Sequence, residues 1–166
     1  KLKQKDIFEN IKEKNLARAL HLFNKTNQFN FNLNRYTNTT LKKLLKKKIY
    51  SIEIISFKDK FGDHGIIGAY IVKQDKFKVE IIDFVLSCRV LNRYIEDFII
   101  LKIMKDNKNK KISIFYKRDK VNDILIPIFL KKEFFELKKK NKKIFKYDIK
   151  PLNKSYEIEK IFNHRT

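Results

Sequence analysis

Cys88, the single cysteine of the chain, is the residue best suited to covalent chemistry. It ends an apolar run that predicts a buried strand, and a helix is predicted to begin a few residues later. We therefore expect the thiol near unpaired helix N–H groups and beside Arg89, and both features stabilise the thiolate that attacks carbonyl groups. The alternative is that Cys88 is a small apolar residue packed at the strand end.

Asp63 and His64 are the candidates for proton transfer or for hydrogen bonds to a substrate. They lie between Gly62 and Gly65. These two glycines and Gly68 are the only glycines of the chain, and all three fall within one short segment. The same residue types commonly build turns between strands, so a purely structural turn is the alternative.

The segment 24–30 is dense in amide side chains, which bind polar ligands or satisfy buried backbone groups. With a guanidinium close behind, it could bind an anion such as a phosphate or phosphopantetheine. The alternative is a loop fixed by its own side-chain hydrogen bonds, with Phe29 and Phe31 covering the edge of the core. The candidate binding residues here are Asn24, Thr26, Asn27, Gln28 and Arg35. We see no spacing typical of a metal site in the sequence.

The chain is strongly basic, with 40 Lys and Arg residues against 19 Asp and Glu residues and a formal net charge of +21. Such a surplus attracts polyanions or acidic proteins. The charge is carried mostly by Lys and accompanies many Ile, Asn and Phe residues, which is typical of AT-rich coding sequence. Nucleic acid has to be considered as a partner, but the dispersed lysines and the lack of a recognised nucleic-acid-binding motif argue against it.

The composition, with 43% hydrophobic residues in 166, predicts a single domain over residues 1–166. No apolar run approaches the roughly 20 residues that span a bilayer. The lone cysteine and the absence of a signal-like N-terminal segment favour the cytoplasm. Because the chain opens on Lys1, we expect it to be part of a longer protein.

Hydrophobic periodicity predicts an α+β fold. The meander of three strands, the strand–helix–strand unit and the closing pair of strands together predict a mixed, mostly antiparallel sheet with helices on both faces. The expected helices cover residues 7–23, 37–47, 91–105 and 121–130, and the expected strands cover residues 49–57, 65–73, 76–87, 111–116, 134–137 and 143–149.

Three sequence blocks, in this order along the chain, resemble the signature blocks of FkbH-like proteins. The resemblance implies a phosphatase-like domain of the HAD superfamily followed by a GNAT-like acyltransferase domain, and this chain would be the second of the two. In that family the pair loads glyceryl or a related small hydroxyacyl group onto an acyl carrier protein. The blocks are residues 24–30 (NKTNQFN, with Arg35 and Tyr36 beyond), 59–65 (DKFGDHG) and 87–93 (SCRVLNR, with Glu96 beyond).

The resemblance implies an enzyme in which Cys88 carries the acyl group as a thioester. Arg89 and Arg93 would steer phosphate, Asp63 or His64 would assist proton transfer, and Glu96 would join the substrate site. The implied partners are an acidic carrier protein bearing phosphopantetheine and the upstream phosphatase-like domain, with no cofactor resident in this domain. Two alternatives remain open: a non-catalytic module that docks the carrier protein, and a basic nucleic-acid-binding domain.

The sequence departs from the family pattern at Asn92 and Tyr94, where glycine or a small residue is usual. GNAT-like folds place their ligand between the strand that ends near Cys88 and the strand expected at residues 111–116. The glycine-rich turn lets backbone N–H groups approach the pyrophosphate of coenzyme A. The tyrosine general acid of ordinary GNAT enzymes also lacks a counterpart near Phe129. We therefore expect coenzyme A to bind weakly or not at all.

Overall fold

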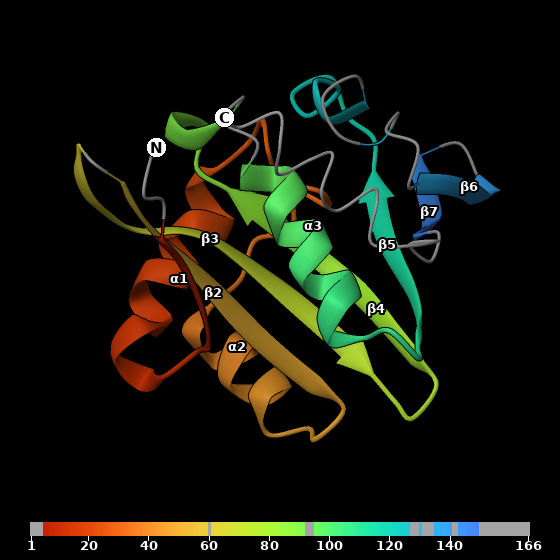
Figure 1. The fold of residues 1–166 in the computed structure, drawn as a ribbon, viewed down its shortest axis with the longest axis horizontal. Coiled ribbons are helices and arrows are strands. Elements are labelled where there is room, and N and C mark those ends of the chain that lie inside the picture. The colour runs from red at the N-terminus through yellow and green to blue at the C-terminus, as the bar shows by residue number, and fades with distance from the viewer. Residues whose placement is uncertain are drawn as a thin grey trace.

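One sheet organises the computed structural model, which describes residues 5–59, 61–91, 95–126, 130, 135–140 and 143–149. Within those residues seven strands lie in the order β1-β2-β3-β4-β5-β7-β6 (Figure 1). β4 and β5 pair in parallel, and all other neighbours pair antiparallel. The predicted mixed, mostly antiparallel α/β architecture is therefore confirmed.

The elements follow the predicted order apart from the first strand. The strands are β1 (Lys5–Asn10), β2 (Tyr50–Asp59), β3 (Gly62–Gln74), β4 (Lys78–Leu86), β5 (Lys111–Lys117), β6 (Phe135–Lys140) and β7 (Ile144–Ile149). The helices are α1 (Glu13–Lys25), α2 (Asn38–Leu45), the single 3-10 turn η1 (Cys88–Val90) and α3 (Ile95–Asp106).

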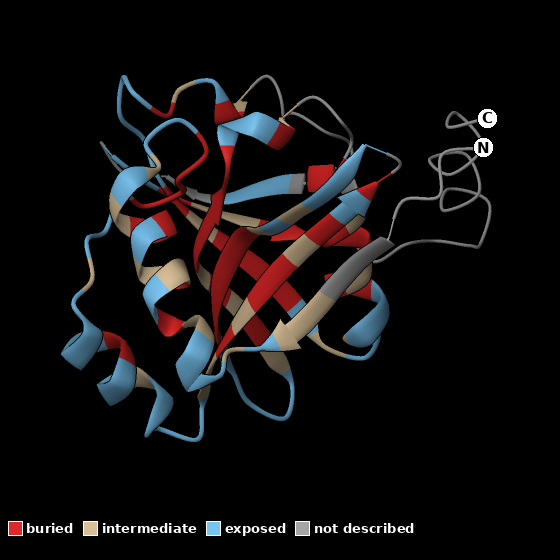
Figure 2. Ribbon diagram, turned by 90° about the vertical axis from the view of Figure 1, so that its left-hand side faces the viewer, coloured by how far each residue is buried: buried red, intermediate tan, exposed pale blue. Residues whose placement is uncertain are grey.

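Two hydrophobic layers hold the helices on opposite faces of the sheet, as the alternation of apolar residues in the strands requires. On β2, for example, Ile54 packs in the layer of α1 and α2, whereas Ile55 packs in the layer of α3. The central strands are buried and the outer surfaces of the helices are exposed (Figure 2). This arrangement fixes the carboxyl end of β4, after which Cys88 and Arg89 follow.

Two predicted helices were wrong in their bounds. The expected helix over residues 7–23 begins only at Glu13, because residues 5–10 pair with β2 as an edge strand in which Phe8 lies opposite Ile55. A short apolar run does not distinguish such a strand from a helix. Of the expected helix over residues 121–130, residues 121–124 form turns, residues 125, 126 and 130 are helical, and residues 127–129 lie outside the described part of the chain.

The parallel pairing of β4 with β5 ends at Ile81 and Ile114. The register between β3 and β4 shifts at the same level, so that Ile82 is an extra residue on β4. Such a bulge bends the strand that carries it. Beyond it the two strands separate, and Figure 1 shows the end of β4, behind α3, well apart from the end of β5. We call the space between residues 82–86 and 115–117 the wedge.

Gly68 on β3 lies against the end of β4, and the packing there predicts the cost of a side chain. A Cβ atom at this position would lie 3.0 Å from Leu86 Cδ1 and 3.1 Å from the carbonyl oxygen of Val85. We expect Gly68→Ala to lower the free energy of unfolding by about 1–3 kcal/mol, measured by urea denaturation. The control Thr39→Ala, on the exposed surface of α2, should cause no loss. An unchanged midpoint for Gly68→Ala would contradict this packing.

Candidate functional site

Cys88 lies in η1, directly after the carboxyl end of β4, and its side chain is exposed. The turn is anchored to β3 because the Ser87 N–H donates to the carbonyl oxygen of Ile67 at 2.7 Å. Arg89 is also exposed, and its Nε lies 3.4 Å from Ser87 Oγ. The structure therefore presents a thiol and a guanidinium to solvent at the open end of the wedge.

Asp63 and His64 belong to the hairpin that joins β2 to β3. His64 Nε2 lies 3.1 Å from Asp59 Oδ1, and its ring stacks on Phe57 with centroids 5.1 Å apart. The Asp63 carboxylate accepts a hydrogen bond from the Gly65 N–H at 2.7 Å, and Gly65 has a φ of 65° that favours glycine. These contacts support the hairpin rather than join either side chain to Cys88.

The polar side chains of the loop after α1 bind the chain itself. Asn24 and the backbone of Tyr36 exchange two hydrogen bonds of 2.8 and 2.9 Å. Arg35 donates to the Phe23 carbonyl at 2.7 Å and to Asn27 Oδ1 at 2.6 Å, which satisfies acceptors at the end of α1. This arrangement agrees with the structural alternative for the loop.

The other predicted site residues are dispersed. Thr26 contributes its carbonyl oxygen, which accepts bonds from Asn30 and Arg35, and Gln28 is exposed in a turn. Glu96 is buried in the first turn of α3. Arg93 lies outside the described residues, as do Asn92 and Tyr94.

Residues 29–32, which we call the inserted segment, lie inside the wedge and pair with both of its strands. On the β4 side, the Phe31 N–H donates to the Phe84 carbonyl at 3.0 Å and the Leu86 N–H donates to the Phe29 carbonyl at 3.0 Å. On the β5 side, the Lys117 N–H donates to the Phe31 carbonyl at 2.8 Å. The segment thus acts as a short additional strand.

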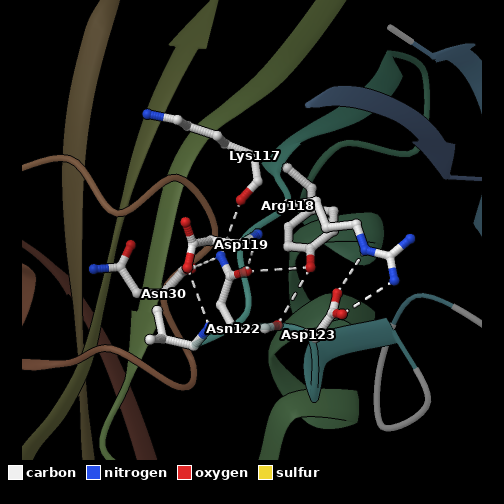
Figure 3. Close-up of polar contacts among 8 residues, drawn as sticks. Asn30, Lys117, Arg118, Asp119, Asn122 and Asp123 are labelled. Carbon is white, nitrogen blue, oxygen red and sulfur yellow. Dashed lines mark hydrogen bonds and ion pairs between the residues drawn. The ribbon is translucent and has the colours of Figure 1, made fainter. Parts of the chain in front are cut away.

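Two asparagines fasten the inserted segment. At the closed end of the wedge, Asn32 Nδ2 donates to the carbonyl oxygens of Ile82 at 2.5 Å and Phe115 at 3.0 Å, and so bridges the separating strands. At the open end, Asn122 Nδ2 donates to the carbonyl oxygens of Asn30 at 2.8 Å and Lys117 at 3.0 Å (Figure 3). Sequence reasoning missed both asparagines.

Asp83 is a buried carboxylate on β4 that sequence reasoning also missed, although a charged residue within the apolar run 79–87 was a usable signal. It accepts hydrogen bonds from the Tyr36 hydroxyl at 2.8 Å, Asn34 Nδ2 at 3.2 Å and the Phe84 N–H at 3.0 Å. Burial raises the pKa of Asp83 to about 6, and the hydrogen bonds partly oppose this rise. Burial and the neighbouring Asp83 together raise the pKa of Tyr36 above its ordinary value.

No family model matches this chain, and no curated protein matches it. Solved structures do. A putative acetyltransferase of the GNAT family from Desulfovibrio desulfuricans superposes with a TM-score of 0.66 at 8% identity over 89% of this chain and 100% of that one. This chain has the GNAT fold. The ribosomal-protein-S18-alanine N-acetyltransferase of Escherichia coli matches with a TM-score of 0.64 at 6% identity, over 91% of this chain and 98% of the enzyme.

A third similar structure is N-acetyltransferase PseH of Campylobacter jejuni, solved in complex with acetyl coenzyme A. It matches this GNAT-like domain with a TM-score of 0.58 at 12% identity, over 89% of this chain and 100% of PseH. In the described part of the domain, no helix is long and apolar enough to cross a membrane. The same residues contain no cluster of three His, Cys, Asp or Glu side chains arranged to hold a metal ion.

The buried carboxylate predicts a pH dependence of stability. Because the pKa of Asp83 rises from 3.8 to about 6 on folding, the folded state keeps a proton that the unfolded state loses between these values. The contribution of the protonated Asp83 carboxyl group to the free energy of unfolding is therefore complete below pH 3.8 and is lost as the pH rises through about 6. A shift of this size corresponds to roughly 3 kcal/mol.

Asp83→Asn should remove this part of the pH dependence, measured as the free energy of urea unfolding from about pH 4 to about pH 8. The comparison is between slopes, so an overall loss of stability in the variant does not affect it. Asp106→Asn, which changes a carboxylate on the exposed surface of α3, is the matched control and should keep the wild-type slope. Equal slopes for Asp83→Asn and wild type would show that Asp83 does not titrate in this range.

Proposed function

We propose that this GNAT-like domain transfers a small hydroxyacyl group, such as glyceryl, to the phosphopantetheine thiol of an acyl carrier protein. The observation that carries the proposal is the exposed thiol of Cys88 directly after β4, beyond the point at which β4 and β5 stop pairing. The three FkbH-like blocks support the same class of reaction, and the GNAT fold agrees with acyl transfer.

The reaction consists of two acyl exchanges at Cys88. The thiolate attacks the carbonyl carbon of an activated acyl donor, an acyl phosphate or a thioester, and the leaving group departs with its bonding electrons. The thiolate of the carrier's phosphopantetheine then attacks the Cys88 thioester. Collapse of the tetrahedral intermediate releases the Cys88 thiolate and leaves the acyl group on the carrier.

Proton transfer is assigned to the start of β3. The proton of the carrier thiol must pass to a base, and we propose Asp63 or His64 for this role. Both lie on the same end of the sheet as Cys88, a few residues before Ile67, whose carbonyl oxygen binds the Ser87 N–H. Water would have to relay the proton, because their side chains contact their own hairpin.

Charge supports an acidic carrier protein as the partner. The chain has a net charge of +21, which attracts an acidic protein over long distances. Arg89 is exposed next to Cys88, where it can meet the phosphate of the phosphopantetheine arm. Arg93, which lies outside the described residues, would bind the same phosphate, and the proposal includes a phosphatase-like domain upstream of this one.

The test is acyl transfer from a glyceryl-loaded acyl carrier protein to the protein, followed by mass spectrometry. We expect a glyceryl adduct on Cys88 in the wild type, no adduct in Cys88→Ala, and loss of transfer to a second carrier protein. Full transfer activity in Cys88→Ala would contradict the covalent role of Cys88. Carrier binding without any transfer in the wild type would instead leave a non-catalytic docking module.

The role of Arg89 can be tested separately. Arg89→Ala should slow transfer about tenfold at low salt, since one charge-assisted contact to phosphate contributes about 1.5 kcal/mol or more. The matched control is Lys105→Ala, which removes an exposed cation at the end of α3 and should leave the rate unchanged. Equal rates for the two variants would remove Arg89 from the site.

A further inference from the structure

The wedge between β4 and β5 is where a GNAT-like fold would hold the pantetheine arm of coenzyme A. Such an arm carries amide groups and binds there by pairing with the free edge of a strand. It therefore needs unpaired N–H and C=O groups on the strand edges that face the wedge. Whether this chain can accept the cofactor is decided by what those edge groups already bind.

Among the described residues, five backbone groups on the two strand edges at the wedge are bound by the inserted segment. On β4 the carbonyl oxygens of Ile82 and Phe84 and the N–H of Leu86 bind Asn32, Phe31 and Phe29. On β5 the carbonyl oxygen of Phe115 binds Asn32, and the N–H of Lys117 binds Phe31. An entering pantetheine would have to break these bonds before it could replace them.

Aromatic packing opposes that exchange. Phe29 and Phe31 are both fully buried, and their rings lie 5.2 and 5.4 Å from the ring of Phe84. Phe31 also makes an edge contact with Tyr116, with centroids 6.1 Å apart. Exposing each phenylalanine side chain would weaken ligand binding by about ten- to a hundredfold.

We infer that the wedge of this domain is filled by its own residues 29–32 and is not a coenzyme A site. The chain differs from a cofactor-binding GNAT domain only at this place. Its strands separate in the same way, but the space between them holds the chain's own residues. Acyl groups then reach this protein only at the outer end of the wedge. The inference does not depend on the role of Cys88, so either proposal can fail alone.

The test is to measure amide hydrogen exchange of the whole chain by NMR with and without acetyl coenzyme A. The reporter is the Phe31 N–H, which donates to the Phe84 carbonyl and would be released if a pantetheine arm displaced the inserted segment. We expect strong protection of this amide that does not change with ligand. Binding that leaves it protected supports the inference, since the ligand then lies outside the wedge.

Stoichiometric binding with at least about tenfold faster exchange at the Phe31 N–H would overturn the inference. A pair of asparagine variants tests what holds the inserted segment. Asn32→Ala removes the bridge to Ile82 and Phe115 and should speed exchange at Phe31 about tenfold or more.

The matched control for Asn32→Ala is Asn107→Ala. Asn107 also donates its amide to a backbone carbonyl, that of Ile103 at 2.9 Å, but it lies at the end of α3 away from the wedge. This variant should leave exchange at Phe31 unchanged. Unchanged exchange in Asn32→Ala as well would show that Asn32 does not hold the inserted segment. The wild-type measurement with acetyl coenzyme A decides the inference itself.

Discussion

The separation of β4 from β5 is the constraint on which the rest of this structure depends. A bulge at Ile82 ends the parallel pairing and leaves backbone N–H and C=O groups on two strands deep inside the molecule. Unpaired groups in such a place are strongly unfavourable, so something polar must enter the gap. In this chain it is a piece of the loop between α1 and α2, and the positions of Asp83, Cys88 and the loop after β5 follow from that solution.

Two asparagine side chains fasten this piece of the loop at its two ends, in a chain that contains only three glycines. The amide of asparagine donates two hydrogen bonds in one plane, which suits a residue that must join two diverging carbonyl groups. Asn32 does so at the closed end and Asn122 at the open end. Asparagine is one of the residue types that are typical of AT-rich coding sequence, and at these two positions it has a defined structural role. Near residue 30, the side-chain amides of Asn24, Asn30 and Asn32 all donate hydrogen bonds to backbone carbonyl groups of the chain itself.

The sequence predicted the meander of β2, β3 and β4 because each strand is an apolar run bounded by turn residues, and Asp75 closes the second hairpin as expected. It also predicted the start of α2, where the Thr37 side chain accepts from the Thr40 N–H at 3.1 Å. The inserted segment could not be predicted, since its partners are backbone groups exposed only after β4 bulges and β5 arrives. Asp83 was missed because one carboxylate within an apolar run gives no indication of its partners Tyr36 and Asn34.

The contacts of the inserted segment join residues that are far apart in the sequence, and this affects how the protein folds during its synthesis. Asn32 bonds to Phe115, and Asn30 bonds to Asn122, across 83 and 92 residues. Contacts of such range form late, because the intervening chain must first be closed into a loop. During synthesis, Phe29 and Phe31 leave the ribosome long before β5 does. The nascent protein therefore carries these two aromatic side chains without the β5 residues of their hydrophobic core until its second half emerges, and transiently exposed apolar side chains of this kind favour aggregation.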